Sequence, residues 1–207
     1  MWPAWPHLRY FALLSLAQTF WFGFIYGGAD LITAHGARRL RVHLEFEEML
    51  PFVPAMVWIY MSIYLLFAVA PFILHSRREL RALVITFALV TLCAGVCFLL
   101  FPAELDFPIP PDLGTSVALF HLADRLNLDY NQVPSLHVAL SVVCAAVFAS
   151  YAGAKMRIFL WLWALAIGAS AVLTYQHHLL DVLAGLLLGW VAERLVYQRL
   201  RTSDLWA

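Results

Sequence analysis

Six long apolar stretches dominate the sequence, and five of them contain no charged residue. The hydrocarbon core of a bilayer is about 30 Å thick, and a helix of roughly 20 residues spans it. We therefore expect an all-α fold, an integral membrane bundle of six transmembrane helices, which forms a single membrane domain over residues 1–207. The expected spans are residues 11–29, 49–74, 82–103, 136–154, 158–176 and 179–197.

The composition excludes an ordinary soluble domain, because 63% of the residues are hydrophobic and only 13% are charged. The formal net charge is zero, so we expect no nucleic-acid partner. The chain does not begin with the basic leader, short apolar core and small-residue cleavage site of a signal peptide. We therefore expect the first stretch to be a retained span.

Nine of the thirteen basic residues fall on one side of such a bundle, the side shared by both termini and by the loops after the second and fourth spans. They are Arg9, Arg77, Arg78, Arg81, Lys155, Arg157, Arg194, Arg199 and Arg201. Because cytoplasmic loops carry an excess of positive charge, we expect cytoplasmic termini, in a plasma membrane or a bacterial inner membrane. The long connection 30–48 suits an amphipathic interfacial helix, and residues 117–128 show a helical pattern.

The first of two polar sites at a membrane end is the sequence PSLH, residues 134–137. Pro134 disfavours helix at the residue before it, and Ser135 is a favourable N-cap for the apolar helix that follows. His137 then lies in the first helical turn. Unpaired backbone N–H groups and the positive end of the helix dipole make such a turn suitable for a phosphate or another anion.

The second polar site is the sequence HHLLD, residues 177–181, at the junction of the last two expected spans. If this segment is helical, His177 and Asp181 share a face, and the carboxylate can accept a hydrogen bond from one imidazole nitrogen. The other nitrogen is then available as a nucleophile or a base. His178 points away by roughly 100°, and we expect it to shape the pocket or the membrane interface.

The two polar sites are expected to meet. Forty residues separate His137 from His177, enough for one span, a short turn and a second span, so both histidines return to the non-cytoplasmic face. The other histidines are expected to be interfacial polar residues: His7, His35, His43, His75 and His121. Asp129 and Asn131 are turn formers, with or without a substrate role.

At these residues the sequence resembles the type 2 phosphatidic acid phosphatase superfamily of membrane enzymes with six spans. Its proline-serine-any-histidine motif is matched by Pro134, Ser135 and His137. A further motif is matched by Ser170, His177, Asp181, Val182 and Gly185. The resemblance is specific near the carboxy terminus and extends to the earlier part of the chain only through the expected topology.

Two departures from the superfamily pattern concern the cations that bind phosphate. Ala171 stands where the family usually has arginine, and the family's lysine and arginine motif near the end of the third span has no match. A transferring phosphoryl group needs such positive groups. We therefore expect substitutes among the arginines on the non-cytoplasmic side, with Ser135 as a further substrate-binding residue: Arg38, Arg39, Arg41 and Arg125.

The resemblance implies a lipid phosphatase that uses neither a metal nor another cofactor. It implies that His177 attacks phosphorus to form a phosphohistidine, that Asp181 orients His177, and that His137 acts as general acid and then as general base. The expected substrate is a lipid phosphate or phospholipid of the membrane, bound on the non-cytoplasmic side.

Three alternatives to the phosphatase stay open. The superfamily branch that resembles inositol phosphorylceramide and sphingomyelin synthases also lacks the lysine motif, and it passes the head group to an alcohol instead of water. A chain that has lost its phosphate-binding cations is also compatible with a non-catalytic scaffold or lipid-binding protein. The third alternative is a metal site built from His137, His177, His178 and Asp181.

Overall fold

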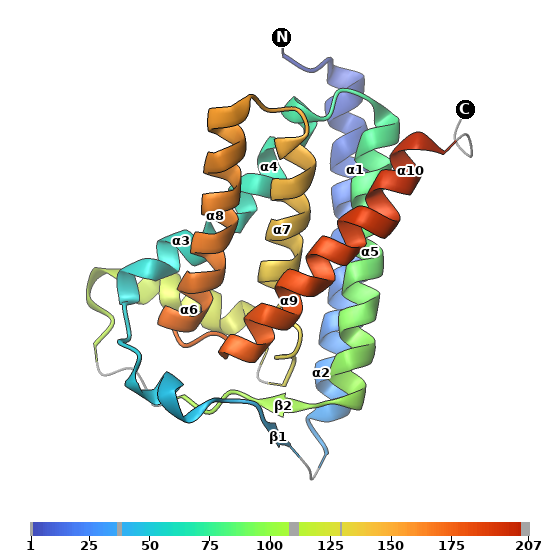
Figure 1. Cartoon of the computed structure of the whole chain (residues 1–207). Helices are drawn as coiled ribbons and strands as arrows, with labels where there is room; N and C mark the ends of the chain where they lie inside the picture. Colours follow the sequence, from blue (N-terminus) through green and yellow to red (C-terminus); the bar gives the residue numbers. More distant parts are fainter. Residues whose placement is uncertain (1, 37–38, 108–111, 129, 204–207) are drawn as a thin grey trace.

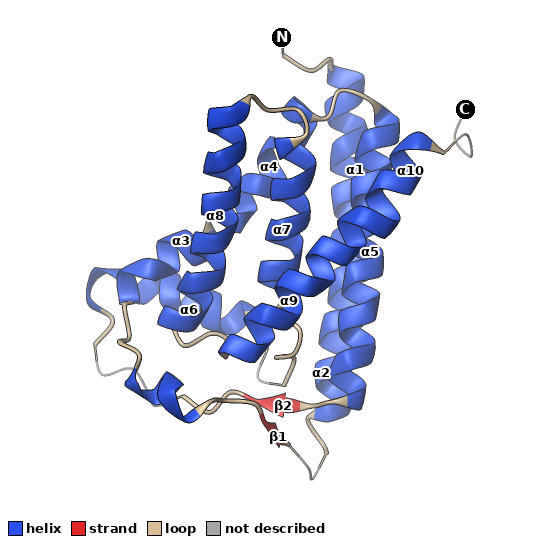
Figure 2. Cartoon of the chain, in the orientation of Figure 1, coloured by secondary structure: helices blue, strands red, loops and turns tan. Residues whose placement is uncertain are grey.

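The computed structural model describes residues 2–36, 39–107, 112–128 and 130–203, which form an almost entirely helical bundle (Figures 1 and 2). The expected all-α class is confirmed. The α-helices are α1 (Trp5–Phe22), α2 (Gly28–Thr33), α3 (Val57–Met61), α4 (Ile63–Ile73), α5 (Arg77–Leu100), α6 (Val117–Leu126), α7 (Leu136–Ala149), α8 (Ala154–Leu173), α9 (Leu179–Ala192) and α10 (Gln198–Thr202). In the described residues two short strands, β1 (Leu40–Arg41) and β2 (Ala103–Glu104), pair in parallel.

A helical segment covers most of each of the six expected spans. A π-helical turn at Gly23–Gly27 joins α1 to α2, and another at Glu193–Tyr197 joins α9 to α10. The helix α5 begins five residues before the expected residue 82, because Ser76 and Glu79 form a capping box. The Ser76 hydroxyl accepts from the Glu79 backbone N–H at 3.1 Å, and the Glu79 carboxylate accepts from the Ser76 N–H at 2.9 Å.

Four helical segments of the described chain are long and apolar enough to cross a membrane. They are Trp5–Thr33, Pro54–Ile73, Arg77–Leu100 and Ala154–Leu173. The apolar helix α7 has 14 residues, about 21 Å at 1.5 Å per residue, which is shorter than the hydrocarbon core. Six complete membrane crossings therefore stay a prediction.

The helix α7 occupies a central position in the bundle. The helix lies between α4, α8, α9 and α5 (Figure 1), and nearly all of its side chains are buried. A helix that is apolar on every side belongs in the interior of a bundle. The beginning of α7, which carries His137, is therefore enclosed by protein.

The connections divide between the two ends of the bundle as the sequence predicts. Both termini and the loops α4–α5 and α7–α8 lie at one end, whereas the strands, α6 and the turn before α9 lie at the other (Figure 1). The side of the membrane that each end faces stays a prediction. We call the end with the strands the strand end.

The expected amphipathic helix over residues 30–48 is wrong, whereas the helix expected over residues 117–128 is confirmed as α6. In the first of these connections α2 stops at Thr33, and β1 follows an extended path beside β2, with the Leu40 N–H donating to the Pro102 carbonyl at 2.9 Å. A 3-10 turn at Glu45–Met49 then carries the buried Glu47. Backbone pairing and this buried carboxylate hold the connection against the bundle.

Candidate active site

The start of α7 is built as the PSLH sequence predicts. Ser135 is the N-cap, and its hydroxyl accepts from the Val138 N–H at 3.4 Å. The Ser135 N–H donates to the Asp181 carbonyl at 3.0 Å. This bond links the two polar sites directly, since it connects the cap of α7 to the first turn of α9.

His177 and Asp181 lie side by side, but not because both belong to one helix. The helix α9 begins at Leu179, with His178 as its N-cap, so the condition of a helical His177 is not met. Asp181 reaches back from the first turn of α9: one carboxylate oxygen accepts from the His178 N–H at 2.9 Å and lies 3.4 Å from Nδ1 of His177. Asp181 is fully buried and His177 almost so. The predicted proximity of His177 and Asp181 is therefore confirmed, but the two residues do not share a helical face.

His137 and His177 line the same small cavity at the strand end of the bundle. The cavity has a volume of about 60 Å³, room for a few water molecules. Its lining residues are Phe22, Tyr26, Tyr64, Leu126, Asn127, Asn131, Leu136, His137 and His177. The expectation that the two histidines meet is confirmed.

The His137 ring is held by Tyr60 of α3. The Tyr60 hydroxyl lies 3.0 Å from Nδ1 of His137, and the two rings stack with centroids 4.1 Å apart and planes inclined by 16°. Nε2 of His137 is buried and has no hydrogen-bond partner in the described part of the chain. One nitrogen is thus engaged by the protein, while the other is left for a ligand.

Two asparagines and a tyrosine complete the polar wall of the cavity. Asn127 donates to the Gln176 carbonyl at 2.8 Å and accepts from the Tyr26 hydroxyl at 3.2 Å. Asn131 donates to the Tyr26 carbonyl at 2.6 Å, and its own buried amide oxygen has no partner among the described residues. Sequence reasoning assigned Asn131 no preferred role and did not single out Tyr26, Tyr60 or Asn127. The hydrogen-bond partners of these residues lie far away in the sequence, and packing between the helices brings them together.

His178 faces a separate buried carboxylate. Its Nδ1 lies 2.9 Å from Oε2 of Glu47, and its Nε2 accepts from the Asp106 N–H at 3.2 Å. Glu47 also accepts from the Leu179 N–H at 3.2 Å. Both ring nitrogens of His178 are therefore engaged, which removes it from the alternative metal site. No group of His, Cys, Asp or Glu suited to a metal ion occurs among the residues that the structure describes.

The four candidate arginines lie in different surroundings, and none that the structure describes lines the cavity. Arg41 is 70% exposed and pairs with Glu104 at 3.1 Å, Arg125 is exposed on α6, and Arg38 lies outside the described residues. Arg39 stacks on Tyr130, with its guanidinium carbon 3.7 Å from the ring centroid. One nitrogen of Arg39, Nη1, is buried without a partner in the described chain.

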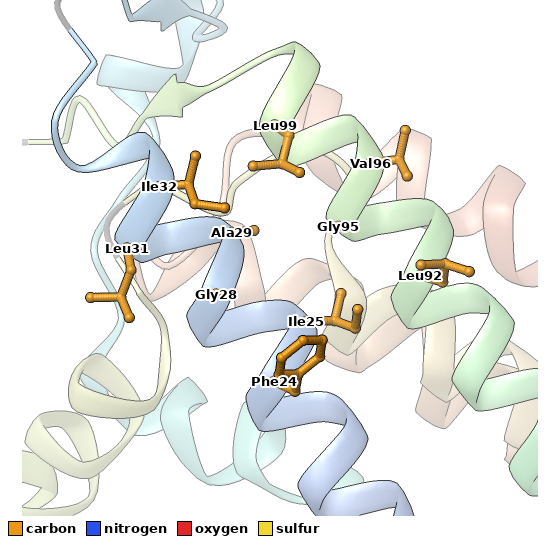
Figure 3. A pocket seen from close by; sticks show the side chains of 10 residues that line it. All are labelled: Phe24, Ile25, Gly28, Ala29, Leu31, Ile32, Leu92, Gly95, Val96 and Leu99. Carbon is orange, nitrogen blue, oxygen red and sulfur yellow. The ribbon is translucent and has the colours of Figure 1, made fainter.

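A larger hollow of about 430 Å³ lies elsewhere, between the α1–α2 segment and α5. Figure 3 shows the aliphatic and aromatic side chains that line it, with Gly28 and Gly95 on the two helical segments. No ionisable side chain lines it, so it suits an apolar chain and no acid–base chemistry. The smaller cavity with the two histidines is the candidate active site.

Two glycines allow α9 to cross α7 at close range. A Cβ at Gly185 would overlap the Ser135 carbonyl oxygen, and a Cβ at Gly189 would overlap that of Ala139. Small residues spaced by four positions let helix backbones approach closely in membranes. This approach brings Asp181 to the Ser135 N–H and so assembles the site.

Replacement of Gly185 by alanine should therefore push α9 away from α7. We expect a loss of about 1–3 kcal/mol in stability, as for other overpacked positions, together with a clear fall in activity. Thermal unfolding in detergent and initial rates would measure the two effects. Gly168→Ala is the control, since its Cβ would meet Val182 at an ordinary 3.4 Å. Equal behaviour of the two variants would contradict this account of the crossing.

The fold and the site together define a helical protein with membrane-length apolar helices and a buried cavity that contains two histidines, one of them backed by a carboxylate. Residues 108–204, a little under half of the chain, match the family model of the PAP2 superfamily. Its members are phosphatases or phosphotransferases and are usually associated with membranes. A comparison with solved structures finds no significant match.

Proposed function

We propose that the protein is a membrane lipid phosphatase that hydrolyses a lipid phosphate through a phosphohistidine intermediate. The observation that carries the proposal is the shared cavity of His137 and His177, in which Nδ1 of His137 is hydrogen-bonded to Tyr60 and Nδ1 of His177 lies 3.4 Å from the Asp181 carboxylate without a hydrogen bond. A double displacement needs one nucleophile and one group that gives and then takes a proton. Two separately supported imidazoles supply both.

In the first step, the lone pair on Nε2 of His177 attacks phosphorus and the bond to the lipid oxygen breaks. Nε2 of His137 gives its proton to that departing oxygen, so the lipid leaves as an alcohol. His177 gains positive charge as the nitrogen–phosphorus bond forms. The buried carboxylate of Asp181, 3.4 Å from Nδ1, stabilises this charge and holds the ring in the correct orientation.

In the second step, Nε2 of His137 takes a proton from water, and the water oxygen bonds to phosphorus. The nitrogen–phosphorus bond breaks, and its electron pair returns to His177 as inorganic phosphate forms. Backbone N–H groups in the first turn of α7 suit the non-bridging oxygens, as the starts of helices bind anions. Ser135 supports this turn as its cap.

The proposed location is the non-cytoplasmic surface of a plasma or bacterial inner membrane. The cavity lies at the strand end, where the described chain carries fewer basic residues than at the end with the termini. The positive-inside rule then puts the termini in the cytoplasm. A phosphate group of the outer leaflet would reach a cavity at the strand end without crossing the bilayer.

The experiment that tests the function offers the purified protein a panel of lipid phosphates and phosphodiesters. Inorganic phosphate and new lipid products are measured with and without added alcohols, and with and without a chelator. Phosphate release that is insensitive to the chelator supports the phosphatase. If new phosphodiester products form, and only when an alcohol is present, the protein is a phosphotransferase and not a phosphatase. If no compound is turned over, the result favours a non-catalytic protein.

Among the candidate arginines, Arg39 is the one that we propose as a substrate contact. It stacks on Tyr130, the neighbour of the cavity residue Asn131, and its buried Nη1 has no partner in the described chain. Arg39→Gln should lower kcat/KM by about 10- to 100-fold, the range of a lost charged hydrogen bond. Initial rates over a range of substrate concentrations measure this effect.

Arg41→Gln is the matched control, because Arg41 is exposed and already paired with Glu104. Exposed ion pairs contribute little, so this variant should keep nearly the original kcat/KM. A larger loss in Arg41→Gln than in Arg39→Gln would reverse the assignment.

A further inference from the structure

We infer that Tyr60 is the positioning residue of His137 and fixes which of its ring nitrogens exchanges protons in the cavity. The inference rests on the proposed function, in which His137 is the general acid and base. Tyr60 lies before the segment that matches the superfamily model, residues 108–204, so that match carries no information about it. The inference comes from the geometry of the two rings.

Three contacts fix the arrangement of Tyr60 and His137. The Tyr60 hydroxyl is 3.0 Å from Nδ1, the rings stack at 4.1 Å, and Tyr64 meets the His137 ring edge-on at 6.4 Å. Tyr60 is fully buried, and a buried hydroxyl normally keeps a hydrogen-bond partner. The stack fixes the plane of the His137 ring, and the hydrogen bond fixes its orientation, because a flipped ring would place Cδ2 opposite the Tyr60 hydroxyl.

A tyrosine hydroxyl suits a histidine that changes protonation state during turnover. The hydroxyl can donate to Nδ1 when this nitrogen is bare, and it can accept from Nδ1–H when the ring is protonated. After Nε2 has given its proton to the leaving oxygen, the ring keeps Nδ1–H bonded to Tyr60. The bare Nε2 then faces the cavity, ready to take a proton from water.

The partners of the two histidines differ in charge, which matches their different roles. His177 lies beside a carboxylate, which can only accept and which stabilises positive charge on the ring. That suits a nucleophile that becomes positive when it bonds to phosphorus. His137 lies beside a neutral phenol, which directs the ring without adding a charge that would retain its proton.

The test compares Tyr60→Phe with Tyr151→Phe. Phenylalanine keeps the ring that stacks on His137 and removes only the hydroxyl. Tyr151 bonds to Glu79 at the opposite end of the bundle, so its variant removes a hydroxyl far from the cavity. For an alkyl phosphate, we expect Tyr60→Phe to lower kcat by about 10- to 100-fold, part of the effect of a whole general acid–base. KM should change little, and Tyr151→Phe should keep nearly full activity.

A second readout does not depend on turnover. In protein labelled with ¹⁵N-histidine, the ring nitrogen signals of His137, identified as those absent from His137→Gln, should shift in Tyr60→Phe while those of His177 stay in place. Unchanged His137 signals, or a kcat equal to that of Tyr151→Phe, would overturn the inference. A wild-type protein without turnover would refute the proposed function, whereas the nitrogen signals would still decide the pairing.

Discussion

Replacement of His177 by glutamine is expected to lower turnover by about 10⁴- to 10⁶-fold, the scale seen when a catalytic nucleophile is removed. Glutamine roughly preserves the size and polarity of the side chain but cannot form the phosphoenzyme. The buried Asp181 carboxylate, 3.4 Å from Nδ1 of His177, would lose the group that it supports. Phosphate release would measure the loss of turnover, and acid-labile radiolabel on the protein would measure the loss of the phosphoenzyme.

His121→Gln is the control for this substitution. His121 is an exposed histidine of α6 at the strand end, so its loss should leave turnover and thermal unfolding nearly unchanged. His177→Gln should unfold at a temperature close to that of the wild type in detergent. A variant that folds and keeps a tenth or more of the original rate would end the proposed mechanism.

The second large effect is expected for His137→Gln, about 10²- to 10⁴-fold in kcat for an alkyl phosphate, the usual contribution of general acid–base catalysis. With 4-nitrophenyl phosphate the loss in the first step should be much smaller, because nitrophenolate leaves without a proton. Breakdown of the phosphohistidine still requires a base. Label should therefore accumulate on His177 in this variant, as rapid-quench experiments would detect.

The two histidine variants thus give opposite labelling results with the activated substrate. His177→Gln should carry no label, whereas His137→Gln should carry more than the wild type. Label that fails to accumulate in His137→Gln would contradict a base role in the second step. If peptide mapping finds the phosphate label on His137, then His137 is the nucleophile and the proposed roles of the two histidines are reversed.

The parts of the site that depend on local spacing were predictable from the sequence. The cap at Ser135 follows from the residues on either side of it, and the meeting of His137 with His177 follows from the 40 residues between them. These features need only the length of a helix and the chemistry of its first turn. The helical pattern of residues 117–128 likewise predicted α6.

The parts that depend on packing between distant helices were not predictable. Tyr60 reaches His137 across 77 residues, and Glu47 reaches His178 across 131. A tyrosine in an apolar stretch is typical of the membrane interface, and a glutamate in an acidic connection is typical of an exposed surface. Only the assembled bundle distinguishes these two residues from others of the same kind.

The start of α5 differs from the expected span because a capping side chain overrides hydropathy. The charged residues before residue 82 belong to α5 because Ser76 caps them. By contrast, α9 begins at Leu179, the first residue of the expected span 179–197, where the Asp181 carboxylate accepts from the His178 N–H. An apolar pattern contains no information on either capping interaction.

The wall of the cavity has a consequence for how relatives of this chain should be compared. Both histidines and Asp181 fall within residues 108–204, as do the lining residues Leu126, Asn127, Asn131 and Leu136, whereas Phe22, Tyr26 and Tyr64 come from the first third of the chain. Part of the surface against which a substrate would rest is thus encoded outside the segment that carries the proposed reacting groups. Substrate preference can drift through substitutions in the amino-terminal helices while both histidine motifs stay intact, so two proteins with identical motifs need not share a lipid.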